Sequence, residues 1–77
     1  QGHAKAQTNL GVMYVKGQGV IQDNVYAHMW WNIAASSGKS ENASKNRDIV
    51  ANRMTPSQIE TAQRLARECV RKKYKGC

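Results

Sequence analysis

The chain has 77 residues, of which 40% are hydrophobic and none is Phe, and its 12 Lys and Arg outnumber its 5 Asp and Glu to give a net charge of +7. A chain of this length forms one small domain that buries only about 60% of the surface its unfolded form exposes. Its apolar runs fall far short of the roughly 20 residues that a membrane-spanning helix needs, and its first residues do not resemble a signal peptide. Composition thus excludes a spanning helix, and the charge raises the question of anionic partners.

The first predicted helix covers residues 3–16. Ala6, Leu10 and Met13, with Tyr14 beside them, follow the i, i+4, i+7 spacing of a buried helical stripe. We therefore expect this stripe to face the core.

Three glycines, Gly11, Gly17 and Gly19, fall close together at the end of this helix. The Gly-x-Gly spacing suggests phosphate binding, but a dinucleotide fingerprint needs a third glycine where Gln22 stands, and a strand before it. We expect instead that Gly11 lets a neighbouring helix approach closely. Gly17 and Gly19 are expected to allow the reversal between two helices.

The second predicted helix begins after Asp23, which can act as its N-cap, and ends at a Ser-Ser-Gly turn. Ala27, Trp30 and Ala34, with the neighbouring Trp31, form its apolar face. Small alanines permit close approach of helix axes, and the indoles fill the space beyond them. His28 lies on the same helix, and we expect it to be solvated or at the rim of the core.

The third predicted helix covers residues 41–53 and is the least periodic of the four. Its inward positions are predicted to be Ala43, Ile49 and Val50.

The fourth predicted helix has the clearest start signal. Thr55 is a good N-cap, Pro56 fits the first helical position, and Gln58 completes a capping box. Its apolar side is predicted to comprise Ile59, Ala62, Leu65, Ala66, Cys69 and Val70.

The cations at the end of this helix are Arg71, Lys72, Lys73 and Lys75. Their ordinary use is to offset the negative end of the helix dipole. The chain contains no known RNA- or DNA-binding motif and no regular aromatic interleaving, so we disfavour nucleic acid as a partner.

Four helices joined by short links suggest a helical hairpin that is repeated once. Ala6-x-x-Asn9 and Ala43-x-x-Asn46 match at an offset of 37 residues, although the second unit is degenerate. Terminal units of a solenoid are commonly degenerate, because one of their faces meets water. The predicted fold class is all-α, a helical-hairpin solenoid of four antiparallel helices.

The first half of the chain resembles one complete Sel1-like repeat, a relative of the tetratricopeptide repeat. The pattern is Ala4-x-Ala6-Gln7-x-x-Leu10-Gly11-x-x-Tyr14-x-x-Gly17-x-Gly19-Val20-x-x-Asp23-x-x-x-Ala27-x-x-Trp30-Trp31-x-x-Ala34-Ala35-x-x-Gly38. The resemblance implies a single domain over residues 1–77, with a complete repeat at 2–38 and a degenerate C-terminal capping helix pair at 39–77. It also implies a fragment of a right-handed superhelix and a bacterial source.

The two cysteines, Cys69 and Cys77, can form a disulfide, because the few residues after Cys69 can turn back at Gly76. The alternative is two free thiols, one of them buried. We favour the disulfide, and with it a periplasmic or secreted location. Neither cysteine has a metal-binding spacing to His3 or His28.

The expected function is that of an adaptor or scaffold that binds another protein, as the resemblance implies. Outward positions of the first helix, Lys5, Thr8, Asn9 and Val12, are the predicted contact residues, and a positive field there would prefer an acidic partner. We expect no catalysis, cofactor or metal, because no nucleophile and base or paired carboxylates fall together. The alternatives are a basic module that binds nucleic acid or anionic surfaces, and a purely structural C-terminal cap of a longer solenoid. Self-association also stays open.

Overall fold

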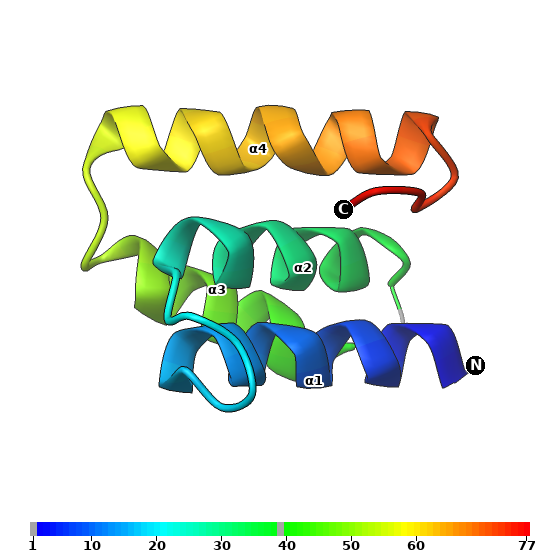
Figure 1. The fold of residues 1–77 in the computed structure, drawn as a ribbon, viewed down its shortest axis with the longest axis horizontal. Helices are drawn as coiled ribbons and strands as arrows, with labels where there is room; N and C mark the ends of the chain where they lie inside the picture. Colours follow the sequence, from blue (N-terminus) through cyan, green and yellow to red (C-terminus); the bar gives the residue numbers. More distant parts are fainter. Residues whose placement is uncertain (1, 39) are drawn as a thin grey trace.

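A computed structural model describes residues 2–38 and 40–77, and within them every regular element is a helix (Figure 1). The helices are α1 (Gly2–Lys16), α2 (Asn24–Ser36), α3 (Glu41–Ala51) and α4 (Pro56–Arg71). The predicted all-α class and the four helices are confirmed. In the described parts of the chain, no helix has the length and apolar character needed to cross a bilayer.

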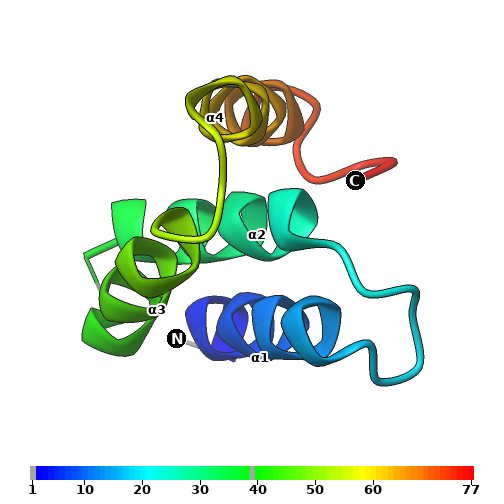
Figure 2. The ribbon, with the colours of Figure 1, turned by 90° about the vertical axis from the view of Figure 1, so that its left-hand side faces the viewer.

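The centre of the fold is α2, which packs against each of the other three helices. Figures 1 and 2 show α1 and α4 on opposite sides of α2, with α3 beside it. Among the described helices, α2 contains no Asp, Glu, Lys or Arg. This composition is typical of a helix that is buried on most of its circumference.

The helix starts follow the predicted caps. The Asp23 carboxylate accepts hydrogen bonds from the backbone N–H groups of Val25 and Tyr26, at 2.9 and 3.2 Å. Thr55 and Gln58 form the reciprocal capping box, with distances of 3.1 and 2.9 Å. These contacts satisfy N–H groups that have no partner inside the helix.

The core consists of two adjoining clusters on either side of α2. The first contains Ala27, Trp31, Ala34, Ala43, Val50, Met54 and Ala62. The second contains Met29, Trp30, Ile33, Ala66 and Cys69. Three of the residues expected to build the helix packing, Ala27, Trp30 and Ala34, are thus buried.

Gly11 of α1 lies directly against the indole of Trp31 in α2. A Cβ atom added to Gly11 would lie 2.6 Å from Cε2 of that ring and nearer still to Nε1. The ring cannot easily move away, because Trp31 is only 4% exposed and its Nε1 donates a hydrogen bond to the backbone oxygen of Thr8 at 3.0 Å. The absence of a side chain at Gly11 therefore sets the α1–α2 spacing.

The reversal between α1 and α2 depends on two glycines in the left-handed region, Gly17 at φ 69° and Gly19 at φ 75°. The turn is closed by the N–H of Gln18 on the oxygen of Met13 at 3.0 Å, and by the N–H of Asp23 on the oxygen of Tyr14 at 2.9 Å. An L-residue with a side chain is strained in this region, so glycine is favoured for a structural reason.

The buried stripe of α1 differs from the predicted one. Ala6 is exposed and Ala4 is buried, while Leu10, Met13 and Tyr14 are half-buried. Ala4 and Gly11 lie two turns apart, so the smallest residues, and not the largest, face α2. The close approach to Trp31 selects this face.

Two apolar side chains expected in the core are exposed: Ile49 at 59% and Val70 at 47%. Ile49 adjoins Val50, and neighbouring helical positions lie about 100° apart, so both cannot face the same cluster. Val50 is the buried member of the pair, at 2% exposure. The predicted end of the third helix is also two residues too late.

A disulfide joins Cys69 in α4 to Cys77 in the C-terminal tail, with 5.8 Å between the Cα atoms. The tail turns back through Lys73 and Tyr74, which have positive φ values of 56° and 67°, and then through Gly76. The N–H of Tyr74 donates to the oxygen of Cys69 at 2.8 Å. The reversal therefore begins earlier than the predicted turn at Gly76.

Candidate protein-binding groove

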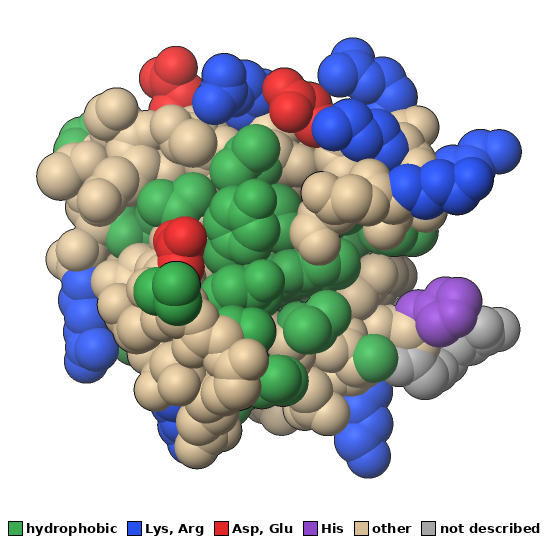
Figure 3. All heavy atoms as spheres, viewed as in Figure 1, with side chains coloured by type: hydrophobic (Ala, Val, Ile, Leu, Met, Phe, Trp, Pro, Cys, Tyr) green, Lys and Arg blue, Asp and Glu red, His purple; other side chains and the backbone are tan. Residues whose placement is uncertain are grey.

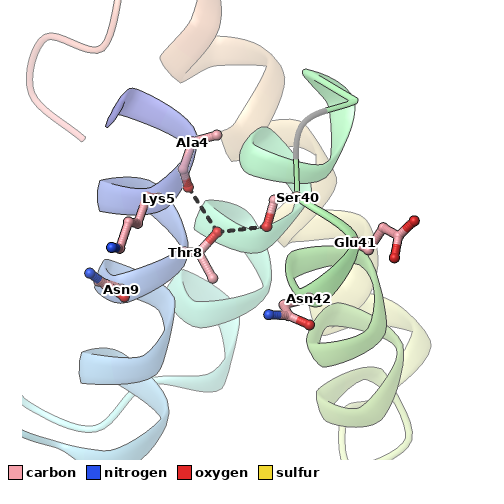
Figure 4. A pocket seen from close by; sticks show the side chains of 7 residues that line it. All are labelled: Ala4, Lys5, Thr8, Asn9, Ser40, Glu41 and Asn42. Carbon is pink, nitrogen blue, oxygen red and sulfur yellow. Dashed lines mark hydrogen bonds between the residues drawn. The ribbon is translucent and has the colours of Figure 1, made fainter. Parts of the chain in front are cut away.

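The N-terminal helices of the two units, α1 and α3, border two hollows, one of which also includes Trp31 of α2. We call the two hollows together the α1/α3 groove. Its first hollow, of about 540 Å³, is lined by Ala4, Lys5, Thr8, Asn9, Ser40, Glu41 and Asn42 (Figure 4). Its second hollow, of about 200 Å³, is lined by Val15, Trp31, Asn46, Ile49, Val50 and Arg53.

A chain of hydrogen bonds fixes the distance between the two walls of the groove. The hydroxyl oxygens of Thr8 and Ser40 lie 3.0 Å apart, and Thr8 donates to the backbone oxygen of Ala4 at 2.8 Å. The Ser40 oxygen also accepts the N–H of Ala43 at 3.2 Å, as the N-cap of α3. Because Thr8 donates to Ala4, its oxygen accepts the proton of Ser40. A side chain of α1 is thus bonded to the residue that caps α3, as Figure 4 shows.

The four predicted contact residues fall into two pairs. Lys5 and Asn9 are exposed and line the first hollow. Thr8 and Val12 are half-buried: Thr8 holds Ser40, and Val12 packs against the first core cluster. Thr8 and Val12 are therefore less exposed than the prediction implied, and their role as contact residues stays a prediction.

The opposite wall was missed by the sequence analysis. Asn42 in the first hollow, and Asn46, Ile49 and Arg53 in the second, all come from α3 or the turn that follows it. The offset of 37 residues between the units relates Lys5 to Asn42, Asn9 to Asn46 and Val12 to Ile49. Applying that offset to the predicted contact residues would have found three of these four positions.

Charges of both signs border the groove, with two cations and one carboxylate among its lining residues. Lys5 is matched by Glu41 in the first hollow, and the cation of the second hollow is Arg53. In Figure 4 the Glu41 side chain points away from α1, whereas Asn42 points toward it. The walls thus present amides to a ligand more than charge.

His28 differs from its prediction, since it is 3% exposed and its Nδ1 has no hydrogen-bond partner among the described residues. Burial lowers the pKa of His28 below 6.5, and the positive charge of Arg47 lowers it further, while Asp48 opposes the shift. Both charged residues lie on α3, where Arg47 also donates to Asn32 of α2 at 3.2 Å. A neutral His28 is therefore part of the α2–α3 contact.

The pH dependence of stability follows from this lowered pKa. An unfolded chain takes up the proton at 6.5, whereas the folded chain resists it to lower pH. Stability is then complete above the unfolded pKa and falls as the pH drops below it. Urea unfolding between about pH 7.5 and 5.5, above the titration of the carboxylates, is expected to show this loss in the native chain.

The matched control for this pH series is His28→Leu, which cannot be protonated, with the exposed His3 left in place. The variant is expected to show a nearly flat profile over the same range. An equal slope in both proteins would contradict the assignment to His28.

The chemistry of the groove suits binding. The described residues contain no group of three His, Cys, Asp or Glu side chains placed to hold a metal ion. Hydroxyls, amides and one exposed isoleucine line the groove, over an indole floor. Hydroxyls and amides are able to hydrogen-bond, and an exposed isoleucine beside an indole is able to contact an apolar group.

The chain begins with an antiparallel helical hairpin, α1 and α2, whose loop depends on two glycines. A third helix, α3, then borders a groove together with α1. This arrangement is that of a helical-hairpin repeat protein. The family model of the Sel1 repeat matches residues 4–39, which span α1, the glycine turn and α2. That segment is a Sel1 repeat, and its helical hairpin agrees with the fold of the chain. Sel1 repeats in general mediate contacts between proteins. No curated protein and no solved structure gave a significant match to the chain.

Proposed function

We propose that the chain is an adaptor module, without catalytic activity, whose α1/α3 groove binds a segment of another protein. The observation that carries this proposal is Ile49, which is 59% exposed and lies beside the hollow that has Trp31 at its floor. Single exposed hydrophobic residues are common on protein surfaces. Ile49 differs from these because it lines a concave site that also contains the Trp31 indole. Side chains that contribute most to binding energy at protein interfaces commonly occupy such sites.

The amides of the groove support the same function. Asn9 on α1 faces the same groove as Asn42 and Asn46 on α3, and none of the three side chains makes a hydrogen bond in the described residues. An amide offers both donors and an acceptor, so it can pair with the backbone of a bound segment. Such pairing gives affinity for a peptide of varied sequence, and the Ile49 hollow adds selectivity for an apolar side chain.

The organisation and location of the protein are part of this proposal. Residues 2–38 would be the complete repeat and residues 39–77 a degenerate capping pair within one domain. A disulfide is compatible with an oxidising compartment, and the periplasm or the exterior of a bacterium is our proposal.

Partner capture tests the function. A photo-reactive amino acid at Asn9 or at Ile49 is expected to crosslink a partner in cells, whereas the same group at Gln63, exposed on α4, is expected not to. Ile49→Asp should then weaken binding of the captured partner by about tenfold or more, because it puts a charge in an apolar anchor position. Isothermal calorimetry measures this change.

Ile21→Asp is the matched control, since Ile21 is 89% exposed in the loop between α1 and α2 and lines neither hollow of the groove. Its effect is expected to stay within about twofold. Equal losses from both variants would contradict the groove proposal. A steep loss of binding with salt, unaffected by Ile49→Asp, would support the alternative of a basic module for nucleic acid or anionic surfaces.

A further inference from the structure

The seam between α2 and α4 has a covered side and an open side. On the covered side, the tail with the Cys69–Cys77 disulfide lies beside Tyr26, Met29 and Leu65. On the open side is a hollow of about 360 Å³, the α2/α4 pocket. It is lined by Asn32, Ile33, Ala66, Arg67, Val70 and Arg71, with Ser36 at its edge.

The floor and one rim of the α2/α4 pocket are apolar. Ile33 and Ala66 form the floor and are 3% and 5% exposed, so they are fixed by the second core cluster. Val70 stands at the rim with 47% exposure. An adjoining hollow of about 290 Å³ has Ile33 and Val70 in common with the α2/α4 pocket. This adjoining hollow extends to Tyr74, which is 49% exposed. The apolar surface is thus larger than one side chain.

The other rim of the pocket is cationic. Arg67 and Arg71 lie one helical turn apart on α4, and both are exposed. Neither forms an ion pair among the described residues, where one pair, Arg47–Asp48, is found within 4 Å. Arg47 lies nearby, because it donates to Asn32 at the pocket wall, but its charge is offset by Asp48.

Positive charge is concentrated on α4 and in the residues that follow it. Six of the 12 Lys and Arg residues fall between residues 64 and 75, against one acidic residue in that stretch, Glu68. Figure 3 shows blue Lys and Arg side chains along α4 and gathered at its C-terminal end. The α1/α3 groove, by contrast, has charges of both signs.

We propose that the α2/α4 pocket is a second interaction site, which binds an acidic segment of another protein that carries an apolar side chain. The apolar side chain enters the pocket over Ile33 and Ala66, beside Val70. Carboxylates that flank it pair with Arg67 and Arg71, whose planar guanidinium groups bind carboxylate in a two-bonded geometry.

The shape of the site favours a protein segment over a lipid surface. A flat anionic membrane would meet the exposed lysines near the end of α4 as readily as the two arginines, and it would leave the hollow over Ile33 unfilled. A helical segment with Glu residues one turn apart matches the one-turn spacing of Arg67 and Arg71. This inference does not depend on the function proposed for the α1/α3 groove.

The test uses the whole chain with its disulfide and a synthetic helical peptide as the probe. The peptide has a Leu and two Glu residues one turn apart on the same helical face, and two matched peptides replace Leu by Ser or the Glu residues by Gln. Amide and methyl NMR spectra of the chain are recorded during titration. Resonances of Ile33, Ala66 and Val70 are expected to shift and to saturate. Both altered peptides are expected to bind about tenfold more weakly or worse.

Single variants of the chain locate the charge contacts. Arg67→Glu and Arg71→Glu are each expected to weaken the probe by about tenfold, because each replaces an attraction by a repulsion. Lys72→Glu makes the same change of charge on the covered side of the seam, and its effect is expected to stay within about threefold. Ile49→Asp in the α1/α3 groove is expected to leave the probe affinity unchanged, so failure of one site is distinguishable from failure of the other.

Several outcomes would overturn the proposal. The first is shifts confined to the α1/α3 groove, and the second is binding that is indifferent to the change from Leu to Ser. Equal loss from Lys72→Glu would show general attraction to positive charge. Vesicles of phosphatidylserine and phosphatidylcholine that shift the same resonances and displace the peptide would assign the surface to a membrane.

Discussion

Gly11→Ala is expected to lower the free energy of unfolding by about 1 to 3 kcal/mol, although alanine is the better helix former by about 1 kcal/mol. The added methyl group would overlap the Trp31 indole, whose Cε2 atom would lie 2.6 Å away. Trp31 is held by burial and by its hydrogen bond to Thr8, so α1 must move instead. Urea unfolding followed by circular dichroism measures the loss. For a domain of this size each kcal/mol corresponds to roughly 4–8 °C in melting temperature.

The control is the same substitution in a Trp31→Val background. The valine side chain ends at its Cγ atoms and so lacks the ring atoms Nε1, Cδ1 and Cε2 that meet the new methyl group, and Gly11→Ala is expected to be neutral or stabilising there. The difference between the two backgrounds measures the coupling of the two residues. An equal effect in both backgrounds would mean that contact with the indole does not explain the glycine.

The sequence predicts the helices of this fold well, because each has a local signal. Asp23 and the Thr55–Gln58 box are bonded as their types suggest. The turn at Gly17 and Gly19 has the left-handed geometry that glycine favours. These interactions span a few residues, so tertiary packing does not override them.

The predictions that fail concern which face of a helix is buried. On α1 the predicted buried stripe was the one of large residues that contains Leu10. The buried stripe is instead the one of small residues, because the contact with Trp31 requires close approach of the two helices. His28 was placed at the rim, yet three helices surround α2. The lack of charged residues in the second predicted helix is the signal that would have indicated its central position.

The candidate groove was half predictable. Lys5 and Asn9 could be placed on an exposed face because the sequence of a single helix is enough to indicate which of its faces is polar. The α3 wall with Ile49 requires knowing that the two units lie side by side, and the third predicted helix has too few apolar residues to define its own face. Arg67 was not singled out and Arg71 was assigned to the helix dipole, since only the fold turns the two side chains toward a pocket floored by Ile33.

Reduction of the Cys69–Cys77 disulfide is expected to lower the free energy of unfolding by about 2 to 3 kcal/mol. The bond closes a short loop, with a sequence separation of 8, and such a closure restricts the unfolded chain by an amount of this order. The melting temperature should then fall by roughly 10–20 °C. Thermal unfolding with and without a phosphine reductant measures this change.

The native tail should also loosen when the bond is removed. Lys73 and Tyr74 hold left-handed backbone conformations that cost roughly 1 kcal/mol or more each for residues with a side chain, and the disulfide opposes their release. Hydrogen exchange at the Tyr74 amide, which donates to Cys69, is expected to accelerate more than exchange in α2. Cys77→Ser should match the reduced native chain and should not respond to reductant. A shift of less than about 3 °C on reduction would contradict this account, because the tail would then be held by its other contacts alone.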